Sequence, residues 1–249
     1  DAIYGKLFIG EIEGSVLTSL KIKDVNLTLG GDTLAAFDYL NLRFNPIQLL
    51  FDRIDVRSLE INNPKIRLLQ DSTLAWNIEK LAKPTEEDTT SSEFPYSIQV
   101  NKLIINNFNV IRKSYSNLSI NEKVESFDIN NLVINNLNLD LTAFVDIENN
   151  EYYLELRNFN FNSNLKHFNL KNLTGNIGVT DKTVRVSKLN LVSDNSEIGI
   201  DLGLDNLNVL GEIKDEELRN AEFSLNLFAD NFDFIDVKNF VPSFDLLVG

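Results

Sequence analysis

The sequence predicts an all-β fold: a long, strongly twisted and curled antiparallel sheet, shaped like a half-pipe, with a few short capping helices. Apolar and polar residues alternate along most of the chain, which is typical of strands with one buried face. One phrase also recurs: apolar, x, apolar, two polar positions, apolar, x, apolar. It is formed by Ile54, Val56, Leu59 and Ile61; Ile98, Val100, Leu103 and Ile105; Phe127, Ile129, Leu132 and Ile134; Leu154, Leu156, Phe159 and Phe161; and Val184, Val186, Leu189 and Leu191.

The two-residue gap inside each phrase shifts the alternation by one position. A shift of one residue moves every following side chain to the other face of a strand. An inserted β-bulge restores the original face and bends the strand at that point. The phrase therefore predicts bent strands and a sheet that curls around a continuous apolar surface. That surface is either a packed core or an open groove, and the choice decides the function.

The first 50 residues predict three strands and one short helix. The strands are 3–13, 20–29 and 34–44, where the alternation is clearest. Gly30-Gly31 indicates the hairpin turn between the second and third strands, because glycine accepts positive φ. Asn45-Pro46 indicates a helix start, with Asn as the N-cap and Pro at the first helical position.

The next segment predicts a strand pair, a helix and a loop. The strands are 54–61 and 65–69, separated by a proline, and 74–81 is predicted as a short helix. Residues 82–95 are acidic and rich in Ser and Thr without apolar periodicity, which predicts a mobile acidic loop. The loop is a possible domain boundary, but the strand phrase resumes after it. We therefore expect residues 1–249 to form one continuous β-groove segment.

The remainder is almost entirely strand phrases with Asn-rich turns between them, from 96 to 204. Residues 214–220 are polar and predict either an exposed helical turn or a loop. Residues 223–228 predict another strand. Part of 230–244 predicts a short helix over the end of the sheet.

Composition excludes several classes of function. The net charge of −14 and the pI near 4.5 argue against nucleic-acid binding, which needs Lys and Arg to neutralise phosphates. The absence of Cys excludes disulfides and thiolate chemistry. No run reaches the roughly 18 to 20 apolar residues of a membrane span, and we expect no signal peptide within these residues. The chain also contains no Met, so we interpret it as a segment of a longer protein whose anchor lies outside these residues.

Residues that could act in catalysis, or could hold a metal or a cofactor, are sparse. His167 is the only histidine, whereas catalytic triads and most zinc sites need His with a nucleophile or further ligands. Carboxylates are scattered, and no Gly-rich phosphate loop or calcium-loop spacing is present. The sequence therefore predicts no catalytic residue, no cofactor and no metal site. Asn is very abundant. The abundance reflects either a compositional bias of the genome or a ladder of exposed Asn side chains on the polar face of the strands.

Several stretches resemble the N-terminal region of the TamB family, the translocation and assembly module subunits, in the wider AsmA-like group of bridge-like lipid transfer proteins. The family pattern is a strand, a Gly-Ser-Leu turn and an apolar strand ending near Val, then a strand with Asn-Pro and a short helix, then a strand pair with Pro. The matching residues are Ile12–Val25, Ala35–Leu50 and Ile54–Ile66, with looser matches at Ser193–Ile198 and Asp236–Pro242.

The resemblance implies a periplasmic, β-rich protein anchored in the inner membrane by a segment outside this chain. Such proteins are long taco-shaped sheets with an apolar interior. They are implicated in moving phospholipid toward the outer membrane, and in outer-membrane protein assembly with a barrel partner. That partner would meet regions outside this chain.

Three functional hypotheses follow. The first is a lipid conduit in which acyl chains slide along an apolar groove, with Phe127, Ile129, Leu154, Leu156, Val184 and Val186 as candidate groove-lining residues. These residues could instead pack as an ordinary core. The second is a scaffold for outer-membrane protein assembly or secretion, which captures a client strand at a sheet edge without transporting lipid. The third, an enzyme using two carboxylates, is the least favoured, and we expect no enzymatic activity.

Overall fold

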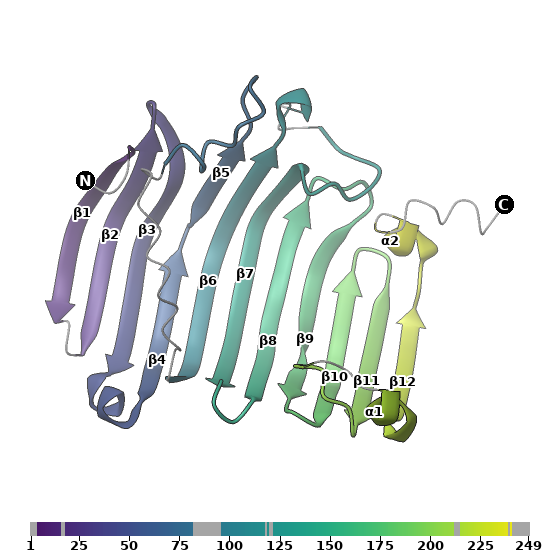
Figure 1. Cartoon of the computed structure of the whole chain (residues 1–249). Coiled ribbons are helices and arrows are strands. Elements are labelled where there is room, and N and C mark those ends of the chain that lie inside the picture. The colour runs from purple at the N-terminus through teal and green to yellow at the C-terminus, as the bar shows by residue number, and fades with distance from the viewer. Residues whose placement is uncertain are drawn as a thin grey trace.

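The computed structural model describes residues 4–15, 18–81, 96–117, 119, 122–211, 215–238 and 240, and these form one curled sheet (Figure 1). In this part of the chain the strands are β1 (Lys6–Ser15), β2 (Ser19–Leu29), β3 (Asp32–Asn45), β4 (Arg53–Asn62), β5 (Lys65–Leu69), β6 (Ser97–Lys113), β7 (Asn131–Asp146), β8 (Glu151–Ser163), β9 (Asn169–Val179), β10 (Thr183–Ser193), β11 (Glu197–Asp205) and β12 (Glu222–Asn231). The short helices are η1 (Pro46–Phe51), η2 (Tyr115–Asn117), α1 (Asp215–Asn220) and α2 (Phe234–Lys238).

The strands follow one another across the sheet almost in chain order. The order is β1-β2-β3-β4-β6-β7-β8-β9-β10-β11-β12, and β5 continues beyond β4 between β3 and β6. All pairings are antiparallel except those of β4 and β5 with β6. A parallel pair needs a long crossover, and the segment from residue 70 to residue 96 supplies it. Part of that segment, the predicted acidic loop at 82–95, lies outside the described residues.

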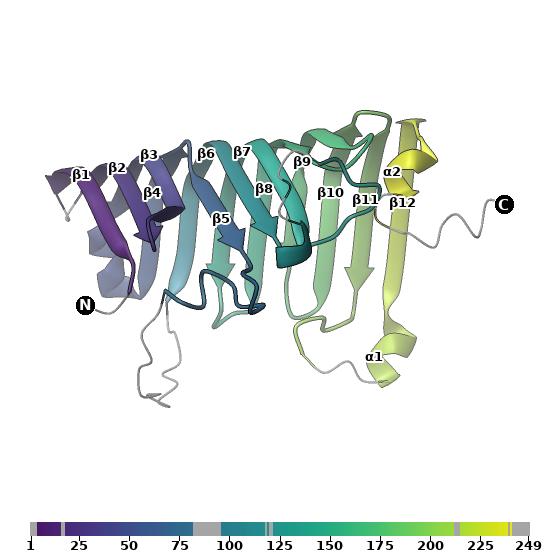
Figure 2. The same cartoon turned by 90° about the horizontal axis from the view of Figure 1, so that it is seen from above.

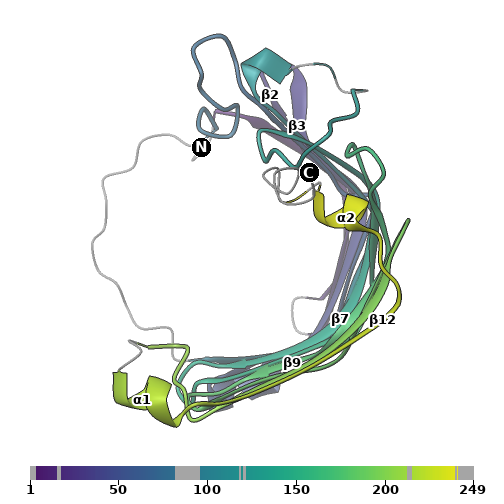
Figure 3. The same cartoon turned by 90° about the vertical axis from the view of Figure 1, so that its right-hand side faces the viewer.

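The sheet is twisted and curved along its strands. Viewed along the stack of strands it has a C-shaped profile, with α2 on the concave side (Figure 3). Viewed from above, successive strands turn progressively from β1 to β12 (Figure 2). The predicted all-β curled sheet is confirmed, and the parallel pairing beside β6 is the one departure from a wholly antiparallel sheet.

In four of the five phrases the two-residue gap coincides with a register shift, as expected for a bulge. The pairing of β6 with β7 shifts between Val100 and Leu103, and the pairing of β10 with β11 shifts between Val186 and Leu189. Lys188, inside the second gap, has a left-handed φ of 53°. Since each bulge adds a residue and bends its strand, repeated bulges account for the curl of the sheet.

The abundant Asn residues cluster at a second set of bulges. Asn63, Asn107 and Asn136 all have φ between 51° and 57°, a region that Asn tolerates better than most residues. The Asn107 side-chain amide donates to Asn63 Oδ1 at 2.6 Å, and the Asn107 backbone N–H donates to Asn138 Oδ1 at 3.0 Å. Asn138 in turn donates to Asn160 Oδ1 at 3.0 Å. This ladder of amides crosses the polar face and replaces hydrogen bonds that the bulges interrupt.

Local turn chemistry explains three confirmed predictions. Gly30 and Gly31 form the β2–β3 turn with φ of 62° and 97°. The helix that starts after Asn45 is a 3₁₀-helix with Pro at its first turn, although the Asn45 side chain makes no capping hydrogen bond. Pro64 separates β4 from β5, which lie end to end along β6.

The predicted helix over 74–81 is wrong. Asp71 Oδ1 accepts hydrogen bonds from the backbone N–H groups of Thr73 and Ala75 at 2.8 and 3.2 Å, and this holds the chain in a turn. Asn77 then pairs with β5, donating its backbone N–H to the Leu69 carbonyl at 2.9 Å. Side-chain bonds to nearby backbone compete with helix formation, and here they override an apolar spacing that suggested a helix.

The predicted strand through Phe127 and Ile129 is also wrong, because β7 begins only at Asn131. Asp128 forms a turn there: its carboxylate accepts the Asn130 N–H at 2.8 Å, and its carbonyl accepts the Asn131 N–H at 2.9 Å. The apolar spacing of the phrase persists by coincidence across this Asp-centred turn.

The buried apolar residues are few for a chain of this size. Among the described residues they are Leu34, Val133, Leu137, Leu165, Phe168, Leu170 and Leu207. Most apolar strand residues are instead only half-buried. In the described residues, no helix has the length and apolar character needed to cross a membrane. The sheet therefore has no second layer of structure, within the described residues, that would bury its apolar face.

Candidate functional site: the apolar concave face

Apolar side chains form rows that cross the sheet from strand to strand. In the first row each residue is the register partner of the next, from β3 to β12: Phe44, Val56, Val100, Ala143, Leu154, Ile177, Val186, Leu202 and Leu225. With neighbouring strands about 4.8 Å apart, these nine positions span roughly 40 Å. Four of the predicted phrases contribute to the rows, because each phrase places its members on one face.

Three further rows run beside the first. One consists of Ile54, Ile98, Val145, Tyr152, Val179, Val184, Leu204 and Phe223. Another consists of Leu20, Leu42, Leu59, Leu103, Leu141 and Leu156, and reaches Gly175 in β9. The last consists of Ile12, Ile22, Leu40, Ile61, Ile105, Leu139 and Phe159. Together they make a nearly unbroken apolar surface, which we name the apolar face.

The apolar face lies on the concave side of the sheet. Phe161, which follows Phe159 on the same face of β8, has its ring 6.4 Å from that of Phe168. The Phe168 ring lies 4.9 Å from the ring of Phe240, which comes shortly after α2. Since α2 lies inside the curve (Figure 3), Phe161 and the rows that share its face point inward.

The aromatic residues near α2 cover one end of the apolar face. Phe127, from the segment before β7, joins the same cluster with its ring 6.0 Å from that of Phe240. The cluster of Phe127, Phe161, Phe168 and Phe240 therefore covers part of the apolar face beside the start of β7, the end of β8 and the start of β9. The rows nearer the middle of the strands have no such covering ring among the described contacts.

A buried carboxylate fixes α2 to the sheet. Asp236 is 7% exposed and accepts hydrogen bonds from the Ser193 hydroxyl at 2.5 Å and from Asn195 Nδ2 at 3.0 Å. Asn195 also donates to the carbonyl of His167 at 2.8 Å, so the β8–β9 and β10–β11 turns meet at this point. We refer to Asp236, Ser193 and Asn195 as the α2 anchor.

Replacing Asp236 with Ala is expected to lower the free energy of unfolding by about 1 to 3 kcal/mol, because buried donors lose their acceptor. Thermal and urea unfolding would measure the change. Asp181→Ala, which removes a carboxylate from an exposed turn, is the matched control and should change little. Equal effects of the two substitutions would show that Asp236 acts only through net charge.

The opposite face of the sheet is polar. One row of register partners across it consists of Glu13, Lys21, Asn41, Glu60, Ile104, Asp140 and Asn158, polar at every position but Ile104. Lys23 lies 2.7 Å from both Glu11 and Glu13, which raises the pKa of Lys23 above its usual range and lowers the pKa of Glu13. Such exposed pairs add little stability, and their role is to keep this face hydrated.

One lysine is completely buried. Lys113, at the end of β6, is 0% exposed and donates to the side-chain oxygen of Asn131. Burial lowers the pKa of Lys113, partly offset by the charges of Glu122 and Asp128. Because the folded state holds this proton less firmly than the unfolded state, the cost of burying the charge is relieved as pH rises through the lowered folded pKa of Lys113, and the free energy of unfolding increases up to the unfolded pKa of about 10.4.

Lys113→Met is therefore expected to flatten the rise of stability with pH just below the unfolded pKa of a lysine, about 10.4. Urea unfolding at several pH values would measure it, with the exposed Lys102→Met as the control. If both variants kept the slope of the wild type, the buried lysine would not be its source.

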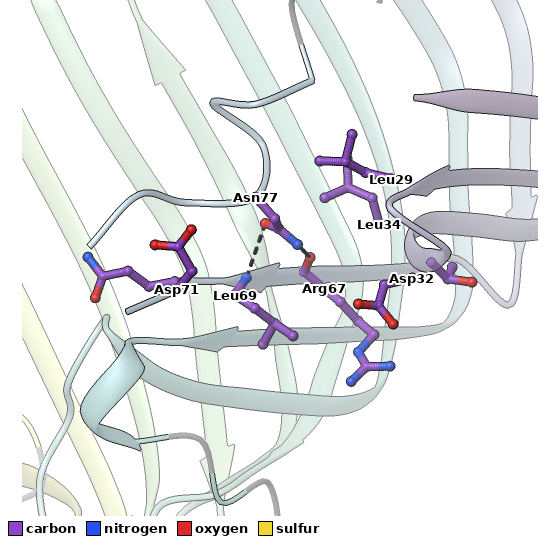
Figure 4. Close-up of a pocket in the computed structure, with 9 residues that line it drawn as sticks. Leu29, Asp32, Leu34, Arg67, Leu69, Asp71 and Asn77 are labelled. Atoms are coloured by element: carbon purple, nitrogen blue, oxygen red, sulfur yellow. Dashed lines mark hydrogen bonds between the residues drawn. The ribbon is translucent and has the colours of Figure 1, made fainter. Parts of the chain in front are cut away.

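Three pockets lined by described residues are small. The one between the β2–β3 turn and β5 holds about 180 Å³ and is lined by Leu29, Leu34, Arg67, Asp71 and Asn77 among others (Figure 4). Two shallow hollows, one beside Tyr153 and one beside Phe8, hold about 320 and 260 Å³. Ligand pockets usually hold 300 to 1,000 Å³, and only the hollow beside Tyr153 reaches the lower end of that range. The apolar face is therefore a larger candidate site than any of these hollows.

The polar chemistry near the small pocket is largely satisfied. Asp71 pairs with Lys80, which lowers the pKa of Asp71. The side-chain amide of Asn77 accepts a hydrogen bond from the Leu69 N–H and donates one to the Arg67 carbonyl, both in β5. The Arg67 Nε is buried without a hydrogen-bond partner. Among the described residues no group of three or more His, Cys, Asp or Glu side chains is placed to hold a metal ion.

The structure brings four of the six predicted groove residues together. Leu154 and Val186 share one row through Ile177, Val184 lies in the next row, and Leu156 lies in the row that reaches Gly175. Phe127 and Ile129 lie apart from the rows, 44% and 45% exposed, and Phe127 belongs to the aromatic cluster instead.

Sequence analysis missed most members of the rows on β2, β3, β7, β9, β11 and β12. Their alternation was visible, but which strands are neighbours was not. Comparisons of the chain with protein-family models, with curated proteins and with solved structures found no match in any of the three. The resemblance to the TamB family therefore stays a prediction that depends on the residues quoted above.

Proposed function

We propose that this chain is a segment of a lipid conduit in which phospholipid acyl chains lie against the apolar face. The observation that carries the proposal is the set of apolar rows that cross the sheet without a covering layer among the described residues. Exposed apolar surfaces larger than a few hundred Å² mark sites of interaction in soluble proteins. The concave shape suits a flexible, elongated apolar ligand better than a flat partner.

The uniformity of the rows favours movement over tight binding. Burying apolar surface contributes roughly 25 cal/mol per Å², and a row of Leu, Ile and Val offers a similar surface at each strand. An acyl chain shifted by one strand, about 4.8 Å, exchanges one set of contacts for an equivalent one. Low barriers between equivalent positions permit sliding, while the phosphate headgroup stays in water at the open side.

The resemblance to the TamB family supports the same proposal and extends it. It would place the conduit in the periplasm, anchored in the inner membrane, with phospholipid moving toward the outer membrane. The barrel partner of that family would contact regions outside this chain. These extensions depend on the resemblance alone, whereas acyl binding depends on the apolar face.

The test is native mass spectrometry with lipid extraction of the protein purified from bacterial cells. We expect bound phospholipid in the wild type and at least a tenfold loss in Ile177→Asp, which puts a charge in the middle of the first row. The matched control is Asn176→Asp, which adds the same charge one residue away on the polar face. Circular dichroism and thermal unfolding would verify that both variants are folded.

Two outcomes would contradict the conduit. The first is a folded, lipid-free protein that takes up no phospholipid from vesicles. The second is equal loss of lipid in Ile177→Asp and Asn176→Asp, which would show that lipid does not bind at the apolar face. A lipid-free protein with saturable affinity for an extended peptide would favour the scaffold instead, since the outer strands β1 and β12 each leave one edge without a strand partner among the described residues.

A further inference from the structure

A charged residue, Arg112, continues the apolar face at the end of β6. In the rows named above, from β1 to β12, every residue is uncharged. Val110 on β6 is the register partner of Ile134 on β7, and Ile134 is the partner of Ser163 on β8. Ser163 follows Phe161 by two residues and therefore shares its inward side. The same side is occupied by Val110 and, two residues later, by Arg112.

The Arg112 guanidinium lies against an indole ring. Its Cζ is 4.5 Å from the ring centroid of Trp76, and both side chains are half-buried. Trp76 forms a β-bridge with Gln70 beside the end of β5, and the next residue, Asn77, donates its backbone N–H to the Leu69 carbonyl at 2.9 Å. The stacking offsets part of the cost of placing a cation on an apolar surface and holds the guanidinium in place.

Arg112 has no anionic partner in the described part of the chain. No described carboxylate forms an ion pair with it, and no described group accepts a hydrogen bond from it, although the chain carries 37 Asp and Glu residues. Two acidic residues before it in the chain are already engaged: Asp71 pairs with Lys80, and Glu79 accepts the N–H of Trp76 at 3.0 Å. The N–H donors of the guanidinium are therefore available to an anionic ligand.

We propose that Arg112 and Trp76 bind the phosphate of a phospholipid whose acyl chains lie along β5 to β7. The inference rests on the proposed function and adds the place where the headgroup is held. A guanidinium donates two parallel hydrogen bonds to two phosphate oxygens. Arg112 is the residue before the last of β6, which ends at the rim of the sheet beside η2 (Figure 1), where a headgroup reaches water.

The apolar residues below Arg112 match the length of a lipid leaflet. The hydrocarbon core of a bilayer is about 30 Å thick, so the acyl chains of one leaflet reach about 15 Å. Along β6, Val110 and Phe108 lie about 7 and 13 Å from Arg112. A phosphate at Arg112 therefore puts the chain ends just beyond Phe108. Apolar register partners on the neighbouring strands would flank the chains: Ile66, Leu68, Leu132, Ile134 and Leu137.

The combination of a cation and an apolar surface favours a phospholipid over simpler ligands. Free phosphate would use the guanidinium and leave Val110 and Phe108 uncovered. A lipid without phosphate would cover these side chains, and its burial of the guanidinium without an acceptor would cost free energy. A phospholipid satisfies both parts of the site at once.

Trp76 is the single tryptophan of the chain, so its fluorescence reports this site. The protein would be titrated with dihexanoylphosphatidylglycerol below its micelle concentration, with dihexanoylglycerol, and with inorganic phosphate. We expect the phospholipid to bind at least tenfold (about 1.4 kcal/mol) more tightly than either of the others. Equal affinity for dihexanoylglycerol, or for inorganic phosphate, would overturn the proposed headgroup site.

Arg112→Gln should remove the preference for the phospholipid over dihexanoylglycerol. The matched control is Arg67→Gln, which removes the same charge from β5 on the opposite face, where Arg67 is the register partner of Ile111. Calorimetric titration would measure both variants, because the first substitution changes the surroundings of Trp76, and circular dichroism would verify that both are folded. An unchanged preference in Arg112→Gln, or equal losses in the two variants, would overturn the assignment.

Quenching of Trp76 by spin-labelled phospholipid tests the orientation of the ligand. A nitroxide on the headgroup should quench Trp76 more strongly than a nitroxide at the end of an acyl chain. Equal quenching, or stronger quenching by the chain end, would contradict a headgroup at Arg112.

The Ile177→Asp variant separates failure of this site from failure of the conduit. If Ile177→Asp loses phospholipid while Arg112→Gln binds it with the affinity of the wild type, the conduit stands and the headgroup site is wrong. If the wild type binds no phospholipid at all, both proposals are wrong. Weaker phospholipid binding in both variants, with dihexanoylglycerol binding lost only in Ile177→Asp, is the result that we expect.

Discussion

Gly175→Ala is expected to lower the free energy of unfolding by about 2 to 6 kcal/mol. Gly175 has φ of 152°, a region that side-chain-bearing residues avoid at a cost of about 1 to 3 kcal/mol. An added Cβ would lie 2.8 Å from the Cα of Leu189, which is backbone and cannot rotate away. Forcing atoms into a packed position costs about 1 to 3 kcal/mol more. Urea unfolding would measure the loss.

Gly178→Ala is the control in the same strand. A Cβ there meets nothing within 4 Å and the backbone does not have positive φ. Reducing the freedom of the unfolded chain should make it neutral or stabilising by about 0.4 to 1 kcal/mol. If Gly175→Ala were as harmless as Gly178→Ala, the close approach of β9 and β10 described here would be wrong.

Asn164→Ala is expected to lower the free energy of unfolding by about 2 to 6 kcal/mol. The Asn164 side chain acts as one more residue of a strand: its Oδ1 accepts the N–H of Val133 at 3.0 Å and its Nδ2 donates to the carbonyl of Asn131 at 2.9 Å. All three residues are at least nine-tenths buried. Removing the amide leaves a buried donor and a buried acceptor unpaired, each worth about 1 to 3 kcal/mol.

Asn162→Ala, two residues earlier and exposed in β8, is the matched control. Its effect should stay within about 0.5 kcal/mol, the range of ordinary surface substitutions. Native-state hydrogen exchange offers a sharper readout, since Asn164→Ala should speed exchange of the Val133 amide far more than that of amides in β2. Equally faster hydrogen exchange of all amides in the sheet would show that the substitution destabilises the whole fold and that the Asn164–Val133 hydrogen bond has no local effect.

The fold could be predicted because the strand phrase is a local signal. Each gap reports one bulge, as at Val100 and Leu103, and each bulge both bends a strand and keeps its apolar side. Strand identity, hairpin turns and the curl therefore follow from residues close in sequence. The parallel pairing of β4 with β6 could not be predicted, because it depends on where the chain returns after a long connection.

The predicted helix over 74–81 and the predicted strand through Phe127 and Ile129 were wrong for the same physical reason. Asp71 and Asp128 each form side-chain or carbonyl hydrogen bonds that fix a turn, at Thr73 and at Asn131 respectively. Apolar spacing around these turns imitated a helix in one case and a strand in the other. The candidate site was predicted in part: the residues on β8 and β10 were found from the phrase, while their row partner Ile177 depends on strand order.

A cysteine scan along β8 in the presence of phospholipid tests the central claim most directly. Single Cys substitutions from Leu154 to Phe161 would be labelled with a water-soluble maleimide, with and without phospholipid vesicles. We expect lipid to slow labelling at 154, 156, 159 and 161 and to leave 155, 158 and 160 unchanged, a period of two that breaks at Arg157. Protection on the polar face, or no protection by lipid at any position, would contradict an acyl-binding apolar face.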